Sequence, residues 1–258
     1  MITSFIRLGL CVALITGLSA CAGLNRLQSV ATPNELYALT PKSTFSPNLP
    51  RLTQQIVVEE PTATAAVSTD QIAVQPTALR VQYLPGVRWV DRAPLIVQSL
   101  LIESFENTNR VPAVGSSGIG LRADYYIATD IREFQASVPE DAGPDAPLQV
   151  QVRLNIKLID AREDRIIGSQ SFEERVPSPT DDPVDVTRAF DEALGDVMRD
   201  SIEWSIRRIH THATEREERE ARARRPAPRP SPVSDLADDP LSEPQPPLQD
   251  PAEPQDDG

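Results

Sequence analysis

The sequence predicts an α+β fold, a two-layer sandwich in which two helices cover one face of a mostly antiparallel sheet. Three observations predict it. Residues Leu148 to Ile159 alternate between apolar and polar side chains as far as Leu158, which is the pattern of a half-buried strand. Apolar residues recur at three- and four-residue spacing after Asp91 and again after Asp182, which is the pattern of amphipathic helices. Strand and helix patterns of this kind bury their apolar faces against each other in two layers.

The strand from Leu148 to Ile159 gives the clearest pattern. One face is wholly apolar and consists of Leu148, Val150, Val152, Leu154, Ile156 and Leu158. The other face carries Gln149, Gln151, Arg153, Asn155 and Lys157, so we expect one side of the sheet to pack and the other to meet water or a partner. Flanking strands over Ala123 to Phe134 and Arg165 to Val176 complete a meander.

Shorter strands precede this meander. Glu35 to Pro41 begins the domain, and Gln55 to Glu59 and Gln71 to Gln75 are rich in β-branched residues. In Leu79 to Leu84, Leu79, Val81 and Tyr83 share one face with period two. Pro85-Gly86 is a turn signal, so Val87 to Val90 is predicted to return as the second arm of a hairpin.

Both helices have recognisable starts. Asp91 can accept hydrogen bonds from the free amides of a first turn, Pro94 suits an early helical position, and Asn107 to Asn109 ends the pattern. The last helix begins at Asp182-Pro183 by the same reasoning. Its apolar stripe consists of Phe190, Ala193, Leu194, Val197, Ser201 and Trp204, flanked by Val186, Met198, Ile202 and Ile206.

The amino terminus has the features of a bacterial secretory signal. A short cationic start, an apolar run after Arg7 and small residues before Cys21 form a signal peptide over residues 1–20. Leu18-Ser19-Ala20-Cys21 resembles the lipobox of bacterial lipoproteins, which implies a covalent lipid on Cys21. A retained membrane helix would need about 20 predominantly apolar residues, more than this run supplies. An ordinary cleaved signal with a chance cysteine is the other alternative.

The remaining boundaries follow from composition. Residues 21–33 form a small, polar tether, residues 34–209 form one α+β domain, and residues 210–258 form a charged and then Pro/acidic-rich tail. The Pro-rich part cannot bury enough apolar surface to order itself, and it serves either as a reach toward a partner or as a passive solvated segment. Glu215 to Arg225 either extends the last helix or frays. The formal net charge of −13 argues against a nucleic-acid partner.

Nothing in the sequence predicts an enzyme or a cofactor other than the lipid on Cys21. The two histidines, His210 and His212, stand near the end of the last helix without a third metal ligand at useful spacing. The Gly-rich stretch from Gly115 to Gly120 lacks a phosphate-binding pattern, so a loop is predicted there. Asp130 and Glu133 are interpreted as surface charges.

The order of these segments is similar to that of the ABC-type transport auxiliary lipoproteins, a family that includes the paraquat-inducible operon lipoprotein. The resemblance rests on the lipobox, Tyr37-Ala38-Leu39, Tyr83 to Trp89 leading into Pro94 to Leu101, the strand Ala123 to Phe134, and the helix from Ala189 to Trp204. It implies a non-catalytic periplasmic lipoprotein that works with an ABC permease and ATPase and with an MCE-domain protein. Such a system moves phospholipid or another hydrophobic molecule between inner and outer membranes.

Location and contacts follow as expectations. Ala22, rather than Asp, comes after Cys21, which by the sorting rule of enteric lipoproteins favours the periplasmic side of the outer membrane. Tyr83 and Trp89 are candidate contacts with a partner or lipid, or they fill the seam between sheet and helix. The sequence leaves the choice between monomer and homo-oligomer open. The alternative function is a structural or regulatory envelope lipoprotein that binds a cell-wall or outer-membrane assembly factor through the polar sheet face or the tail.

Overall fold

The computed structural model describes residues 34–139 and 147–225. The predicted signal peptide, Cys21, residues 22–33 of the tether and the tail after residue 225 lie outside the described residues. The chain divides into two compact units, residues 1–217 and 218–258. The sheet, the first helix and most of the last helix belong to the first unit. Within the described residues, no helix is both long enough and apolar enough to cross a membrane.

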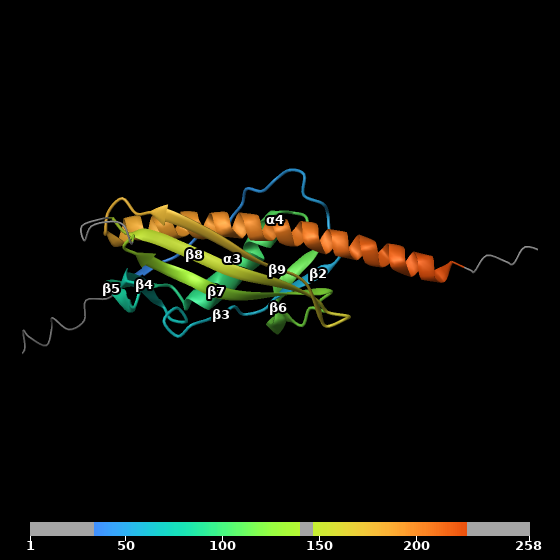
Figure 1. The fold of residues 1–258 in the computed structure, drawn as a ribbon, viewed down its shortest axis with the longest axis horizontal. Coiled ribbons are helices and arrows are strands. Elements are labelled where there is room, and N and C mark those ends of the chain that lie inside the picture. The colour runs from blue at the N-terminus through green and yellow to red at the C-terminus, as the bar shows by residue number, and fades with distance from the viewer. Residues whose placement is uncertain (1–33, 140–146, 226–258) are drawn as a thin grey trace, which may run out of the picture. The chain divides into compact units, whose positions relative to one another are not determined.

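The α+β prediction is confirmed: two helices pack on a mixed sheet (Figure 1). Within the described residues, the elements in chain order are β1 (Glu35–Tyr37), β2 (Gln55–Val58), β3 (Thr62–Ala63), β4 (Gln71–Thr77), β5 (Arg80–Trp89), α3 (Ala93–Asn107), β6 (Ala113–Ser116), the 3-10 turn η2 (Ser117–Ile119), β7 (Tyr125–Ser137), β8 (Gln149–Asp160), β9 (Arg165–Pro177) and α4 (Pro183–Arg224).

The long strand β7 organises the sheet. Along one edge it pairs with β8 in an antiparallel ladder, and β8 pairs with β9 in the same way, which forms the predicted meander. Along its other edge β7 pairs in parallel with three short strands, β2, β3 and β4, in chain order. Residues 55–75 therefore follow β7 from its start to its end. The long ladders are antiparallel, and most of the short pairings are parallel.

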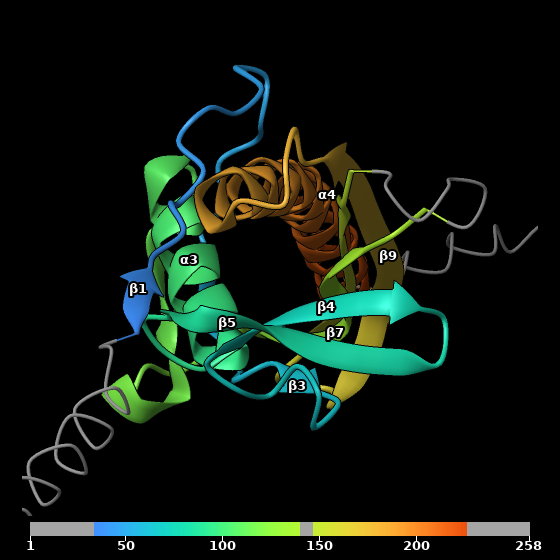
Figure 2. The same ribbon diagram turned by 90° about the vertical axis from the view of Figure 1, so that its left-hand side faces the viewer.

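The Pro85-Gly86 pair does not make the predicted hairpin turn. β5 continues through it, and the hairpin joins β4 to β5 through Ala78 and Leu79 instead. The register between β4 and β5 shifts sharply between Tyr83 and Arg88, so Pro85-Gly86 lies in a bulge. Gly86 has φ 75°, a conformation that glycine adopts without the strain that a side chain would add. Figure 2 shows the β4–β5 hairpin along its length, with β1 beside β5.

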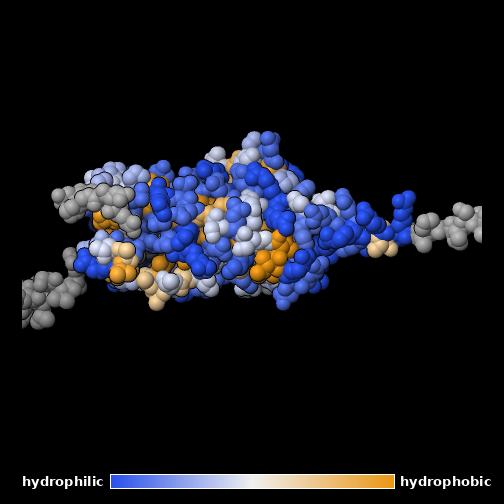
Figure 3. Space-filling model, in the orientation of Figure 1, coloured by the Kyte–Doolittle hydropathy of each residue, from blue (hydrophilic) through white to orange (hydrophobic). Residues whose placement is uncertain are grey.

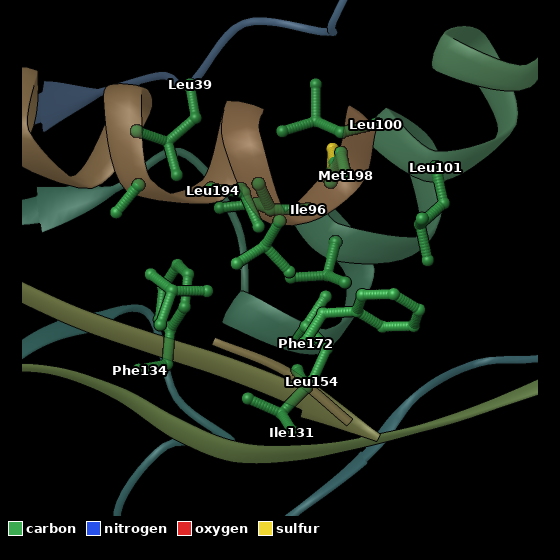
Figure 4. Packing of buried hydrophobic residues seen from close by; sticks show 14 of the residues in the cluster. Leu39, Ile96, Leu100, Leu101, Ile131, Phe134, Leu154, Phe172, Leu194 and Met198 are labelled. Atoms are coloured by element: carbon green, nitrogen blue, oxygen red, sulfur yellow. The ribbon is translucent and has the colours of Figure 1, made fainter. Parts of the chain in front are cut away.

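The core lies between the sheet and the two helices. All six apolar residues predicted to share a face of the central strand are buried there. They meet α3 and α4, whose inward residues include Leu101, Leu194 and Met198 (Figure 4). Gly168 of β9 allows a close approach, because a Cβ at this position would lie 3.1 Å from the indole of Trp204. The amphipathic patterns therefore predicted which faces pack.

The start of α4 agrees with the sequence, whereas α3 begins near the predicted position but without the predicted cap, because Arg92 is its N-cap and makes no side-chain capping hydrogen bond. The carboxylate of Asp91 accepts a hydrogen bond from the backbone N–H of Arg92 (2.7 Å), just before α3. The carboxylate of Asp182 accepts one from the backbone N–H of Val184 (2.9 Å) in the first turn of α4. At its other end α4 continues through Arg224, so Glu215 to Arg225 extends the helix over all but its last residue. Burial continues past Ile209 to His212 and Ala213.

A long loop after β1 crosses both helices. The backbone N–H of Thr40 donates to the Asp191 carboxylate (2.7 Å), and the Lys42 ammonium pairs with Asp196 (2.9 Å), both on α4. The backbone N–H of Lys42 also donates to the hydroxyl of Ser104 on α3 (2.9 Å). These contacts tie the two helices together on the side away from the sheet.

Candidate functional site

Trp89, one of the two candidate contact residues, lies in the core. Its side chain is 1% exposed. The indole meets the ring of Phe190 from α4 edge to face, with centroids 5.1 Å apart, and lies 5.9 Å from the ring of Phe134 on β7. Trp89 thus fills the seam between sheet and helix, which was one of the two roles considered for it.

Tyr83, the other candidate, lies at the surface of the β4–β5 hairpin. Its side chain is 36% exposed. The phenol donates a hydrogen bond to the carbonyl oxygen of Ala66 (3.3 Å), in the loop between β3 and β4. The sequence grouped Tyr83 with Trp89, but the bulge at Pro85-Gly86 separates an exposed part of β5 from a buried part.

The outer face of β7, β8 and β9 carries a row of charges, as the alternation in β8 predicted. Arg153 stands between Glu133 of β7 and Glu173 of β9, and it forms an ion pair with each carboxylate. Arg175 pairs with Glu173 (2.7 Å). Glu133 and Asp130 are therefore partners of arginines, since Asp130 pairs with Arg132 (2.7 Å). This alternation of sign on a flat sheet favours recognition of a polar, charged surface.

A groove of about 530 Å³ lies next to this row of charges, where β4 meets the end of β7. Amides dominate its lining, and the residues that face it include Gln75, Gln135, Gln149 and Gln151 together with Glu133 and Arg175. Side-chain amides both donate and accept hydrogen bonds. The groove therefore suits a polar ligand or a peptide backbone better than an acyl chain.

A buried polar cluster lies at the opposite end of β7, and the sequence did not predict it. The carboxylate of Asp160 is fully buried and accepts hydrogen bonds from the backbone N–H groups of Arg162 (2.8 Å) and Glu163 (3.2 Å). Its other oxygen pairs with the guanidinium of Arg216 on α4 (2.9 Å). His212 is buried beside it, with Nδ1 2.9 Å from the Tyr125 hydroxyl and 3.6 Å from the carboxylate.

The environment of this cluster shifts three pKa values. Burial raises the pKa of Asp160, but hydrogen bonds from two backbone N–H groups and the charge of Arg216 outweigh burial, so the net pKa is lowered. Burial lowers the pKa of His212, and the opposing effect of Asp160 does not compensate. Burial raises the pKa of the Tyr125 phenol. The cluster is therefore a neutral histidine and a buried ion pair that join α4 to the ends of β7 and β8.

The lowered pKa of His212 predicts a loss of stability in mild acid. Unfolding exposes the imidazole and restores its pKa toward 6.5, so the unfolded chain binds the proton more tightly. Above pH 6.5 the imidazole is neutral in both states and costs the folded chain nothing. As the pH falls below 6.5 the unfolded chain takes up the proton first, so the free energy of unfolding declines until the pH reaches the lower pKa of the folded chain. We expect His212→Gln to flatten the decline in the free energy of unfolding between about pH 7 and about pH 5. Urea titrations at several pH values would measure it, with the exposed neighbour changed in His210→Gln as the control. An unchanged slope in His212→Gln would contradict the assignment.

Metal binding finds no support in the described part of the chain. Within it, no group of three His, Cys, Asp or Glu side chains lies close enough to hold an ion. His210 is exposed, whereas His212 is buried in the polar cluster. The predicted lipidation site, Cys21, lies outside the described residues. The outer face of β7, β8 and β9 and the adjoining groove are the candidate contact surfaces of the domain.

The fold is similar to that of two solved structures. Protein XCC0632 from Xanthomonas campestris is 25% identical, with a TM-score of 0.64, and the match covers 69% of this chain and 99% of that one. That protein is described as a member of the DUF330 family. An uncharacterized protein gives a TM-score of 0.51 at 10% identity, over 66% of this chain and 96% of that one, which shows the fold alone.

Sequence comparison adds a relative and a family. The Bradyrhizobium diazoefficiens protein bll6063, described as uncharacterized, is 26% identical over 188 residues, and the match covers 72% of this chain and 49% of that protein. The chain thus spans about half the length of this relative. A family model described as "ABC-type transport auxiliary lipoprotein component" matches residues 37–200. The chain belongs to this family, and the family resemblance inferred from the sequence is confirmed.

Proposed function

We propose that this chain is a lipid-anchored, non-catalytic accessory subunit on the periplasmic side of the outer membrane. In this proposal its partners are an MCE-domain protein and an ABC permease–ATPase complex that moves phospholipid or another hydrophobic molecule between the two membranes. The observation that carries the proposal is the family match over residues 37–200, in a chain whose lipobox ends at Cys21. Ala22 after the cysteine supports the outer-membrane assignment.

The described domain has features of a subunit that docks rather than one that encloses a lipid. Its apolar side chains form a packed core between sheet and helices. Its outer sheet face offers alternating charges and an amide-lined groove, which suit a protein surface. The covered apolar route that acyl chains need across the aqueous periplasm would then belong mainly to the partners.

The proposal is tested by recovery of partners from the envelope. The lipidated protein is purified from detergent-solubilised membranes, and the co-purifying proteins are identified, with the Cys21→Ala protein processed in parallel. We expect an MCE-domain protein or its permease with the wild-type protein and a large loss with Cys21→Ala, because the unlipidated chain leaves the membrane. Recovery of cell-wall or assembly factors without any transporter component would overturn the transport assignment in favour of the alternative function.

Two separate charge-reversal variants test which surface of the domain contacts the partner. Arg175→Glu alters the row of charges beside the groove, whereas Arg188→Glu alters an arginine of similar exposure on α4 that pairs with Asp185. We expect Arg175→Glu to reduce partner recovery and Arg188→Glu to leave it unchanged. Equal recovery from both variants would remove the outer sheet face as the docking surface.

A further inference from the structure

The β4–β5 hairpin exposes apolar side chains at its tip. Leu79 is 99% exposed, Val81 is 45% exposed and Tyr83 is 36% exposed. Leu79 lies in the turn of the hairpin, Val81 and Tyr83 follow at alternate positions of β5, and Tyr83 contacts the loop that contains Ala66. Figure 3 shows apolar surface at the end of the molecule where Figure 1 labels β4 and β5. Leu79 is almost fully exposed and Val81 and Tyr83 are partly exposed beside it, and an exposed apolar patch of this kind is typical of a contact site.

The charge of this hairpin is opposite to that of the rest of the chain. Asp70 and Asp91 are consecutive acidic residues, so the whole of residues 71–90 contains no carboxylate, in a protein of net charge −13. Two arginines lie between them. Arg88 pairs with Asp70 (3.0 Å), and Arg80 is exposed between Leu79 and Val81. An apolar tip with an arginine and a tyrosine has the composition of elements that enter the headgroup region of a bilayer.

The base of the hairpin, at the opposite end of β5 from the tip, lies beside the start of the domain (Figure 2). β1 pairs in parallel with the last residues of β5, so Glu35 is held beside Val87. Thirteen residues lie between Cys21 and Glu35, which limits the span between them to about 50 Å even when fully extended. A lipid on Cys21 would therefore hold the base of the hairpin within about 50 Å of the membrane surface, a range in which the tip can reach it.

We propose that the tip of the β4–β5 hairpin, Leu79 to Tyr83, inserts into the phospholipid surface that holds the Cys21 anchor. The inference rests on the proposed function, because it takes Cys21 to be lipidated. Leu79 and Val81 bury their side chains at the acyl boundary, and the Arg80 guanidinium turns back to the lipid phosphates. Tyr83 lies at the interface, where its ring and hydroxyl meet apolar and wet surroundings. A second contact of this kind fixes the orientation of the domain on the membrane.

The first test uses the lipidated full chain in vesicles of phosphatidylethanolamine and phosphatidylglycerol. The Leu79→Trp variant places a fluorophore at the tip, and phospholipids with brominated acyl chains quench a tryptophan that reaches them. We expect blue-shifted emission and about twofold more quenching than in the wild-type protein, whose Trp89 and Trp204 provide the background. The matched control is Ile166→Trp. Ile166 is 53% exposed and lies near the opposite end of β7, about 30 Å away along the strand.

The second test removes the anchor and measures the hairpin alone. The Cys21→Ala chain is sedimented with the same vesicles, and Leu79→Asp is expected to weaken its partitioning about tenfold, whereas Ile166→Asp leaves it unchanged. Equal partitioning of both aspartate variants, or no quenching of Leu79→Trp, would overturn the proposal. So would loss of transporter recovery in Leu79→Asp without any change on vesicles, because the tip would then contact a protein.

These outcomes are independent of the proposed transport function. Vesicles contain no transporter component, so failure to recover a partner from the envelope would leave the hairpin result standing. Conversely, recovery of an MCE-domain protein together with an unquenched tip would keep the transport function and reject the membrane contact.

Discussion

Trp89→Ala is expected to lower the free energy of unfolding by about 3–5 kcal/mol. The indole is almost fully buried and holds β5 against α4 through Phe190 and against β7 through Phe134. Truncation removes this apolar burial and leaves a cavity between three elements that collapse cannot easily fill. Urea unfolding of the mature Cys21→Ala chain, followed by circular dichroism, would measure the loss.

Tyr83, the other candidate contact residue on β5, serves as the comparison. Tyr83→Ala removes a partly exposed ring and one hydrogen bond to Ala66, so its cost should be about 1 kcal/mol or less. The two variants therefore separate a residue that holds the fold from a residue that is available at the surface. A similar loss from both would mean that the β4–β5 hairpin and the core unfold as one tightly coupled unit.

Residue periodicity predicted the parts of this fold that depend on one buried face. The alternation in Gln149–Asp160 and the helical stripe after Pro183 each require a single packing surface, and the structure places both on the core. A capping residue located the start of α4 for a similar reason, since Asp182 acts on an amide of the first turn, whereas Asp91 only marks the approach to α3, whose N-cap is Arg92. Such local rules can be applied without knowledge of the neighbouring strands.

Pairings between distant segments could not be predicted in this way. β2, β3 and β4 pair in parallel with β7, and nothing in their short apolar runs specifies a partner about 60 residues later. The bulge in β5 is a similar case. Pro85-Gly86 is equally compatible with a turn and with a bulge, and the pairing to β4 and β1 decides between them.

The polar cluster around His212 was missed because its members come from three elements. Tyr125 begins β7, Asp160 ends β8, and Arg216 lies on α4 among charged residues typical of an exposed helix. One signal was present. The buried stripe of α4 continues at three- and four-residue spacing from Ile206 through Ile209 to His212 and Ala213, which places His212 on the packed face.

Arg216→Ala is expected to destabilise the protein by about 3–5 kcal/mol, because it leaves the buried carboxylate of Asp160 without its cation. The residue lies beyond the segment that matches the family, residues 37–200. The contrast is Glu60→Ala, which breaks the exposed pair with Arg92 and should cost about 1 kcal/mol or less. Equal effects of the two variants in urea unfolding would contradict the assignment of a buried ion pair.

The pH dependence of the stability of Arg216→Ala tests whether the lost charge pair with Asp160 causes the destabilisation. The pKa of Asp160 is lowered on folding, so its contribution is complete above its unfolded value near 3.8 and is lost as the pH falls through the lower folded value. Removal of the Arg216 cation raises the folded pKa toward the unfolded one. The difference in stability between wild type and Arg216→Ala should therefore be largest near neutral pH and should shrink below about pH 4. A difference that stays constant into acid would mean that Arg216 stabilises the protein through its contact with the Tyr125 ring, where the guanidinium carbon lies 6.0 Å from the ring centroid, and not through its pairing with Asp160.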